Sequence, residues 1–154
     1  MRHWRLCVHA LDRTGPAVLT RSFVRWLQRT RPADQISVIA FRGGDVLGDL
    51  PSDVSCTVCL EPSEAWDHRA PVVRRVEQIR ARLGDQPPPD ATLLVSVAAG
   101  QVLGLLPHAD RSTVIWVVEQ GEDLHWLDPP VDLAHVRATW LAGSEGTRAE
   151  LAGR

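Results

Sequence analysis

A glycine and a proline interrupt the chain just after its first apolar run, in the segment HALDRTGPAVL (residues 9–19). A helix that begins after this corner presents unpaired backbone N–H groups and a partial positive charge. Such a helix start can receive an anion, and Arg13 adds a donor for phosphate or sugar hydroxyl groups. Thr14, Gly15 and Pro16 complete the corner, but an ordinary strand-to-helix turn uses the same residue types. Both interpretations stay open at this point.

An acidic segment follows the most hydrophobic run of the chain, in VVEQGEDLHW (residues 117–126). Carboxylates directly after a buried strand can position hydroxyl groups or act as acid and base groups. The polar residues concerned are Glu119, Gln120, Glu122, Asp123 and His125. A solvated loop has the same composition, so a functional and a purely structural interpretation remain equally open.

Two further glycine-containing turns follow expected strands. Gly43 and Gly44 end the second apolar run, and Gly143 precedes Ser144 and Glu145 near the end of the chain. Ser144 is suited to the N-cap of a helix, and an acidic residue such as Glu145 is favoured in the first helical turn. At this second turn the structural interpretation is the stronger one.

Several chemistries are excluded by missing residues. The chain has no G-x-G-x-x-G dinucleotide fingerprint, and all 17 basic residues are arginines, which removes Walker-type phosphate loops and Schiff-base enzymes. The three cysteines are too few for a disulfide scaffold. Cys56 and Cys59 lie in a strand-like segment that places their thiols on opposite faces, so a redox pair is not expected. No zinc-like spacing of Cys and His occurs, and neither a metal nor a cofactor is expected.

Composition indicates a single soluble globular domain spanning residues 1–154. The chain is 44% hydrophobic and 23% charged, with a formal net charge of −2. This balance argues against a nucleic-acid-binding protein, which usually carries a basic surplus. No apolar run approaches the roughly 20 residues of a membrane span, and the N-terminus lacks the apolar core of a secretory signal. We therefore expect a cytoplasmic protein.

Strand-like and helix-like segments alternate along the chain. Strands are predicted at residues 4–10, 35–41, 54–60, 92–97, 113–119 and 139–142. Helices are predicted at residues 16–30, 70–83, 100–106 and 131–137, with a short turn at 45–50 and a last helix beginning at residue 144. The central strands are continuous apolar runs, as expected where helices cover both faces of a sheet. The pattern predicts an α/β fold: a Rossmann-like, doubly wound, mainly parallel sheet in three α/β/α layers.

In such sheets ligands bind beyond the carboxyl ends of the strands. This rule selects the loops at residues 13–16, 43–44, 119–123 and 143–146 as candidate binding loops.

Four segments resemble, in their order and spacing, those of bacterial family 4 glycosyltransferases. HALDRTGPAVLTRSFVRWLQ resembles the family's opening, where a strand leads through a Thr-Gly or Gly-Gly corner into a helix ending in Arg-Trp-Leu. ISVIAFRGGDVLGDL fits the second strand and its Gly-Gly turn. VIWVVEQGEDL resembles the family's apolar strand followed by His-Glu, and ATWLAGSEGTRAEL is similar to its late strand and serine-led helix. The resemblance covers essentially all 154 residues.

The resemblance implies the N-terminal, acceptor-binding half of a GT-B enzyme, in which two Rossmann-like domains face each other across a cleft. Such an enzyme moves a hexose, with retention, from a nucleotide diphosphate sugar to a hydroxyl group of a sugar or lipid-linked acceptor. The second domain, which binds the nucleotide sugar and carries two glutamates seven residues apart, is absent from these residues. We therefore expect a truncated transferase that is inactive alone. Lipid-linked acceptors also leave peripheral membrane association open.

The resemblance also suggests roles for the loops. In the family the first glycine loop lies close to the donor phosphates. A histidine follows the fifth strand, where this chain has Glu119, whose carboxylate could accept a hydrogen bond from a sugar hydroxyl. Glu119 is thus the catalytic candidate. The substrate-binding candidates are Arg13, Thr14, Gly15, Pro16, Gly43, Gly44, Gln120, Ser144 and Glu145.

Two alternatives belong to other functional classes. The first is a stand-alone Rossmann-like binding or interaction domain without chemistry, which the replacement of the family histidine by Glu119 favours. The second, a nucleotide-dependent oxidoreductase, is less favoured because the dinucleotide fingerprint is missing.

Overall fold

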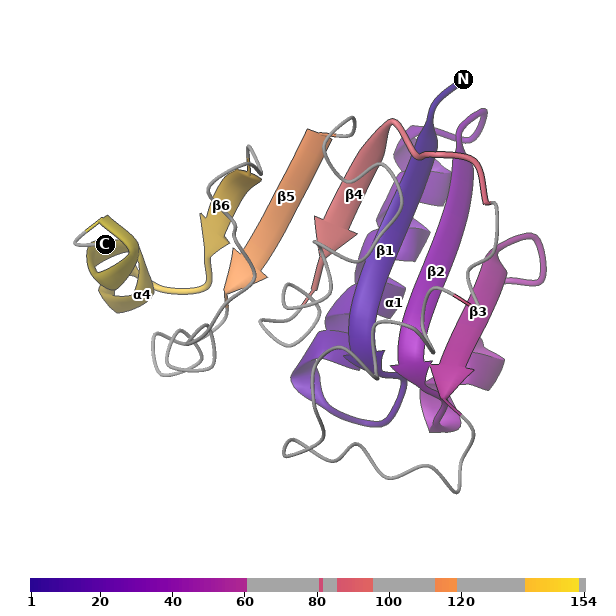
Figure 1. Ribbon diagram of the computed structural model, residues 1–154, viewed down its shortest axis with the longest axis horizontal. Helices are drawn as coiled ribbons and strands as arrows, with labels where there is room; N and C mark the ends of the chain where they lie inside the picture. Colours follow the sequence, from indigo (N-terminus) through magenta and orange to yellow (C-terminus); the bar gives the residue numbers. More distant parts are fainter. Residues whose placement is uncertain (61–80, 82–85, 96–112, 119–137, 153–154) are drawn as a thin grey trace.

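A computed structural model describes residues 1–60, 81, 86–95, 113–118 and 138–152. Six strands form one sheet in the order β3-β2-β1-β4-β5-β6 (Figure 1). The strands are β1 (His3–Ala10), β2 (Gln35–Arg42), β3 (Ser55–Leu60), β4 (Ala91–Leu94), β5 (Thr113–Val118) and β6 (Ala138–Ala142). All five pairs of neighbouring strands are parallel. This order and direction confirm the predicted Rossmann-like α/β fold.

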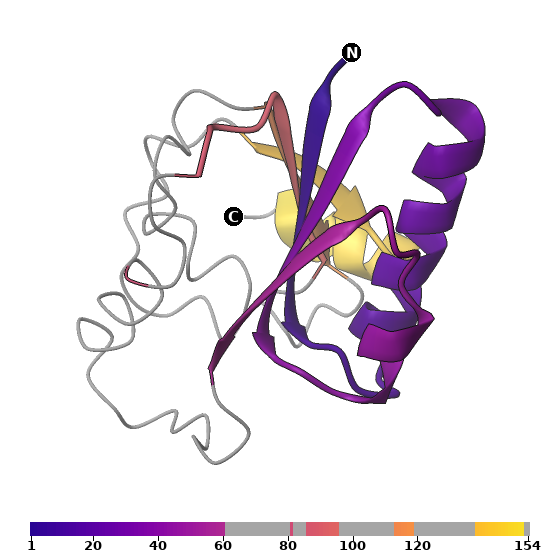
Figure 2. The same ribbon diagram turned by 90° about the vertical axis from the view of Figure 1, so that its right-hand side faces the viewer.

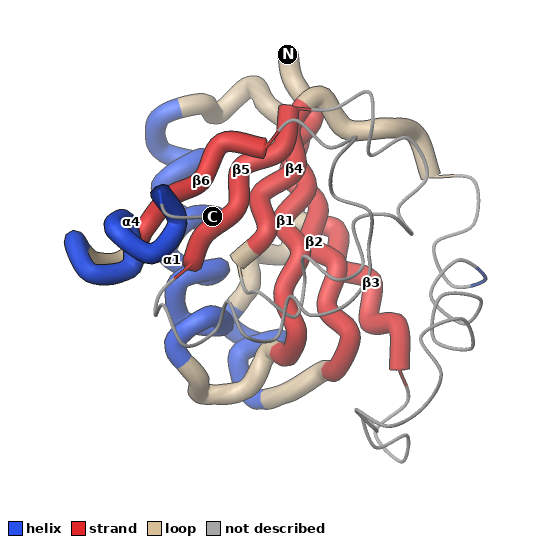
Figure 3. The backbone as a smooth tube through the Cα atoms, turned by 60° about the vertical axis from the view of Figure 1, so that its left-hand side comes forward, coloured by secondary structure: helices blue, strands red, loops and turns tan. Residues whose placement is uncertain are grey.

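The helices of the described part are α1 (Gly15–Thr30), the short 3-10 helix η1 (Asp45–Asp49) and α4 (Glu145–Ala152). The sheet is a single, continuous, twisted layer (Figure 3), and α1 and η1 lie on the same side of it (Figure 2). The helices predicted at residues 70–83, 100–106 and 131–137 lie outside the described residues, apart from residue 81. Of the three predicted layers, the described residues therefore show the sheet and the helical layer on one of its faces. None of the described helices is long and apolar enough to cross a bilayer.

Strand β1 forms the centre of the sheet. It pairs with β2 on one side and with β4 on the other, so Leu6 aligns with both Val38 and Leu93. Leu6 and Val8 are completely buried on the face that α1 covers, and Cys7 is 1% exposed on the opposite face. Burial of both faces explains why Leu6, Cys7 and Val8 are apolar in succession and do not alternate with polar residues.

Helix α1 packs on the sheet through a stripe of buried side chains. Ala17, Thr20, Val24 and Leu27 are spaced by three or four residues and face the sheet. The Thr20 hydroxyl donates to the carbonyl of Pro16 (2.8 Å), so its burial leaves the hydroxyl satisfied. Proline in the first turn begins the helix, and the Arg31 N–H donates to the Leu27 carbonyl (2.7 Å) at its end.

The other face of the sheet carries polar side chains that the sequence pattern did not reveal. Arg5 is 2% exposed and donates to the carbonyl of Pro87 (3.0 Å) and to Gln86 Oε1 (3.4 Å). Beside it, His3 Nε2 and Ser37 Oγ form a hydrogen bond (2.8 Å). Burial, together with the nearby Arg5 charge, lowers the pKa of His3. A buried cation thus lies under one face of the sheet: its Nη2 atom donates to neutral oxygens, and its Nε atom is buried without a hydrogen-bond partner in the described part of the chain.

The cysteines are free thiols, as predicted. Cys7 and Cys59 are buried and Cys56 is half-buried. Burial raises the pKa of Cys7 to about 12 and that of Cys56 to about 11, which opposes the thiolate form needed for redox chemistry.

Two valines of α1 provide a matched test of this packing. Val24 is completely buried against the sheet, and Val18 is 41% exposed on the same helix. We expect Val24→Ala to lower the free energy of unfolding by about 2 kcal/mol, because the lost methyl groups leave a cavity. Val18→Ala should change it by no more than about 0.5 kcal/mol. Urea denaturation measures both values, and equal losses would contradict the packing of α1 described here.

Candidate functional site

The carboxyl ends of the parallel strands share one edge of the sheet (Figure 1). Ala10, the last residue of β1, aligns with Arg42 at the end of β2, and Val118 of β5 aligns with Ala142 of β6. The corner that follows β1 and the loop that follows β2 therefore leave the sheet side by side. The start of α4 follows β6, which lies three strands from β1, or about 14 Å at ordinary strand spacing.

The loops after β1 and β2 are tied together through the backbone of Leu11. The Leu11 N–H donates to the Arg42 carbonyl (3.1 Å), and the Leu11 carbonyl accepts a hydrogen bond from the Val46 N–H (2.9 Å). Gly44 lies so close that a Cβ atom there would be 2.4 Å from the Leu11 carbonyl oxygen. At Gly43 the same atom would meet Val58 at an ordinary 3.8 Å. Of Gly43 and Gly44, only Gly44 is required by the close approach of the two loops.

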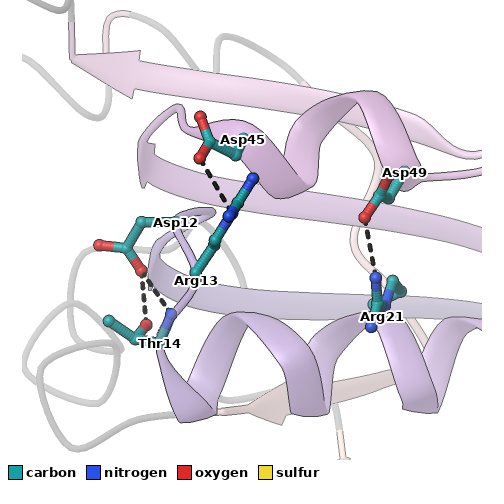
Figure 4. A network of polar contacts seen from close by, with 6 residues as sticks. All are labelled: Asp12, Arg13, Thr14, Arg21, Asp45 and Asp49. Atoms are coloured by element: carbon teal, nitrogen blue, oxygen red, sulfur yellow. Dashed lines mark hydrogen bonds and ion pairs between the residues drawn. The ribbon is translucent and has the colours of Figure 1, made fainter.

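Asp12 stabilises the corner at residues 11–16 through hydrogen bonds to Thr14. Its Oδ1 atom accepts hydrogen bonds from the N–H (3.1 Å) and the hydroxyl of Thr14 (Figure 4). Burial alone would raise the pKa of Asp12, but these hydrogen bonds and the Arg42 charge outweigh it, so the pKa lies below its ordinary value. Thr14 holds the N-cap position of α1, yet its hydroxyl makes no capping hydrogen bond to that helix.

Two ion pairs join α1 and its preceding corner to η1 (Figure 4). Arg13 Nε lies 3.2 Å from Asp45 Oδ2, and both side chains are highly exposed. Arg21 Nη1 lies 2.8 Å from Asp49 Oδ2 in a less exposed pair. Between α1 and η1 lies a groove of about 390 Å³, lined by Arg13, Val18, Arg21, Asp45, Val46 and Asp49. Its two cations and two anions cancel, so a ligand anion that binds Arg13 must compete with Asp45.

The last candidate loop has a clear structural role. Ser144 Oγ accepts a hydrogen bond from the Thr147 N–H (3.1 Å), and so caps the N-terminus of α4. Glu145 lies in the first turn and pairs with Arg148 one turn later. Both side chains are thereby engaged in starting the helix.

Glu119 and Gln120 lie outside the described residues, as do Glu122, Asp123 and His125. The described part of the candidate site therefore consists of the corner at residues 11–16, the Gly43–Gly44 loop and η1. In this part of the chain, no group of three or more His, Cys, Asp or Glu side chains could hold a metal ion. The sequence pattern did not single out Asp12, Asp45 or Asp49 as site residues. Their only signal in the sequence is that each is an acidic residue near a glycine-containing turn.

The close approach of Gly44 to Leu11 can be tested with alanine. Gly44→Ala should lower the free energy of unfolding by about 1–3 kcal/mol, because the added Cβ collides with backbone atoms that cannot move independently. Gly48→Ala is the matched control, since a Cβ at Gly48 would meet no atom within 4 Å. Chemical denaturation of both variants measures the difference. Equal stability would contradict the contact between the two loops.

The lowered pKa of Asp12 predicts how the stability of the fold changes in acid. A carboxyl group whose folded pKa is depressed stabilises the fold above its unfolded pKa, and this contribution is lost as pH falls through the folded pKa. Thr14→Ala removes the hydroxyl donor, so the pKa of Asp12 should rise toward its ordinary value and the acid-dependent loss of stability should shrink. NMR titration of the Asp12 carboxyl carbon measures this. Ser22→Ala is the control because the Ser22 hydroxyl donates to the Val18 carbonyl and to no carboxylate.

Comparison with known proteins adds no family assignment. No protein-family model matches the chain, and no curated protein matches it. The functional inference therefore depends on the geometry of this edge of the sheet and on the segment resemblance described above. What the geometry offers at the edge where Rossmann-like sheets bind ligands is a helix start, a glycine contact and the Arg13–Asp45 pair, with the Arg21–Asp49 pair further along α1 (Figure 4).

Proposed function

We propose that this chain is the N-terminal, acceptor-side domain of a retaining GT-B glycosyltransferase that moves a hexose from a nucleotide diphosphate sugar to an acceptor hydroxyl. The observation that carries the proposal is the junction of the first two loops at the carboxyl edge of the sheet. Gly44, Asp45 and the corner at residues 11–16 lie together there. Two of the four segments that resemble those of family 4 glycosyltransferases contribute to this junction.

The N-terminus of α1 offers suitable chemistry for phosphate oxygens. The helix has 16 residues and no acidic residue in its first turn. No side-chain oxygen from the described part of the chain caps it, and Thr14 directs its hydroxyl to Asp12 instead. The positive end of the helix dipole is thus left for an anion, with the guanidinium of Arg13 beside it.

In the transfer reaction, negative charge develops on the departing nucleotide diphosphate. In this proposal the corner of α1 and Arg13 stabilise that charge from the acceptor side of the cleft. Asp12 and Asp45, which accept hydrogen bonds or ion pairs at the same corner, are suited to orienting sugar hydroxyl groups. A second domain would supply the main nucleotide-sugar contacts and exclude water on closure.

A non-catalytic binding domain is the second candidate function. The Arg13–Asp45 pair favours this second candidate, because Arg13 must give up its ion pair with Asp45 before its guanidinium can bind a phosphate. An exposed pair of this kind contributes only about 0–1 kcal/mol, so a phosphate can compete with it. The two candidates therefore make different predictions for Arg13 when a nucleotide sugar is added. In the transferase candidate Arg13 exchanges Asp45 for a phosphate, and in the binding-domain candidate it stays paired with Asp45.

Substitutions at the two ion pairs test the proposal. We expect UDP-glucose or GDP-mannose to shift the amide NMR signals of Thr14, Gly15 and Gly44, with a dissociation constant on the order of 1 mM, corresponding to about −4 kcal/mol. Arg13→Gln should weaken this binding several-fold. Asp45→Asn should strengthen it because Arg13 is then free of its partner.

The second ion pair supplies the control. Asp49→Asn removes the same charge from the same groove but releases Arg21 instead of Arg13, so binding should stay unchanged. If neither nucleotide sugar shifts the Thr14, Gly15 and Gly44 signals, the transferase proposal is wrong and the binding-domain candidate replaces it. Equal effects of Asp45→Asn and Asp49→Asn would remove Arg13 from the proposed site.

A further inference from the structure

The amino ends of β1, β2 and β4 meet at the edge of the sheet opposite the candidate functional site (Figure 1). His3, the first residue of β1, is held there from both sides. Its N–H donates to Asp90 Oδ2 (2.7 Å), and its carbonyl accepts a hydrogen bond from the Asp90 N–H (2.9 Å). Its Nε2 atom and Ser37 Oγ of β2 form a hydrogen bond of 2.8 Å. His3 thus joins β1 to β2 and to the residue that precedes β4.

Arg5 adds a buried positive charge to this junction. Side chains alternate along a strand, so His3 and Arg5 project from the same face of β1, and Arg5 aligns with Ser37 of β2 and Thr92 of β4. Only Nη2 of Arg5 makes hydrogen bonds in the described part of the chain, and both of its acceptors are neutral oxygens. No carboxylate of the described residues pairs with the guanidinium. The charge of Arg5 is therefore desolvated without a negative charge against it.

Few charged groups of the described residues face His3. On its own strand there is the cation of Arg5, and on the segment that enters β4 there is the carboxylate of Asp90. Strand β2 contributes the neutral side chains of Ser37 and Gln35, and α1 packs on the opposite face of the sheet. Burial and the Arg5 charge lower the pKa of His3, and Asp90 opposes them only in part. Neutral His3 is therefore the form that fits this junction.

We propose that the amino end of β1 is an acid-sensitive junction, at which protonation of His3 beside the buried charge of Arg5 loosens β1 from β2 and from the segment that enters β4. An imidazolium can still donate from Nε2 to Ser37, so the hydrogen bond itself survives protonation. What changes is the charge, because two cations then lie on one face of β1 with the single carboxylate of Asp90 beside them. This inference is independent of the proposed transferase activity, which depends on the opposite edge of the sheet.

The direction of the pKa shift sets the pH range of this effect. In the opened chain His3 takes up a proton near its ordinary pKa of about 6.5, whereas in the folded chain it does so only at lower pH. The stability of the junction is therefore fully present above about pH 6.5, and it is lost as pH falls from there to the folded pKa of His3. Asp12 is a carboxyl group with a lowered pKa, so its own effect appears in stronger acid and is separable.

Amide hydrogen exchange of the 154-residue chain between about pH 7 and about pH 5 tests the proposal. The amides of Gln35 and Asp90 donate to the carbonyls of His3 and of the residue before it. After correction for intrinsic exchange rates, the protection factors of these two amides should fall several-fold as the pH is lowered. The protection factors of the Leu11 and Val46 amides, whose hydrogen bonds lie at the opposite edge of the sheet, should stay constant.

Three variants separate His3 from a general effect of acid. His3→Gln keeps a polar partner for Ser37 but takes up no proton, so protection at the junction should no longer depend on pH in this range. Arg5→Gln and Arg2→Gln each remove one arginine charge within two residues of His3, but Arg5 is buried and Arg2 is exposed. NMR titration of the His3 ring should show a pKa that rises in Arg5→Gln and stays the same in Arg2→Gln. Circular dichroism establishes that each variant is folded, and His3→Gln decides the proposal if Arg5→Gln does not fold.

Three outcomes overturn the proposal. The first is protection at Gln35 and Asp90 that does not change between the two pH values. The second is an equal loss of protection at Leu11 and Val46, which would show that acid unfolds the whole sheet and not this junction. The third is an acid dependence that persists in His3→Gln, which would assign the effect to a different group.

Discussion

The structure depends on the hydrogen bonding of β1 to a parallel strand on each side. Because β1 pairs with both β2 and β4, the chain crosses over at the centre of the sheet, and successive elements extend outward in both directions. Both faces of β1 are then buried, as Leu6, Cys7 and Val8 show. Parallel pairing also brings every strand end to one edge, so the corner after β1 lies at the centre of that edge. The location of the candidate site follows from this pairing before any side chain is considered.

At that edge, backbone contacts matter more than side-chain contacts. The Leu11 carbonyl accepts a hydrogen bond from the Val46 N–H, and Gly44 lies against the same carbonyl, so the first two loops are joined through their backbones. The exposed pairs Arg13–Asp45 and Arg21–Asp49 add electrostatic complementarity but little stability. A site built in this way keeps its backbone donors fixed while its charged side chains remain free to exchange partners. That division suits the binding of phosphate or sugar groups.

Much of the fold could be predicted from local sequence. Apolar runs identified the strands, although some bounds differ from those predicted. β1 and β6 begin one residue earlier, β3 begins one residue later and β2 ends one residue later. The prediction of a strand at 92–97 was wrong at its end, because β4 spans Ala91–Leu94 and residue 95 is not in a strand. Pro16 and the spacing of Ala17, Val24 and Leu27 identified α1, and Ser144 identified the start of α4. These signals are reliable because each depends on neighbours within a few residues, through helical periodicity, strand alternation or capping. The alternation of the two element types then favoured a parallel sheet.

The sequence by itself thus determined the strands, the helices α1 and α4, the class of fold and the edge at which ligands are expected. Only the tertiary structure decided which residues meet there. Leu11 and Gly44 are far apart along the chain, and nothing local indicates that a Cβ at position 44 has no room. Likewise, the apolar run of β1 gave no sign that Arg5 would be buried beside neutral oxygens, or that Asp12 would take the hydroxyl of Thr14 from the helix. Such contacts depend on strand order and register, which arise from the packing of the whole sheet and not from any single segment.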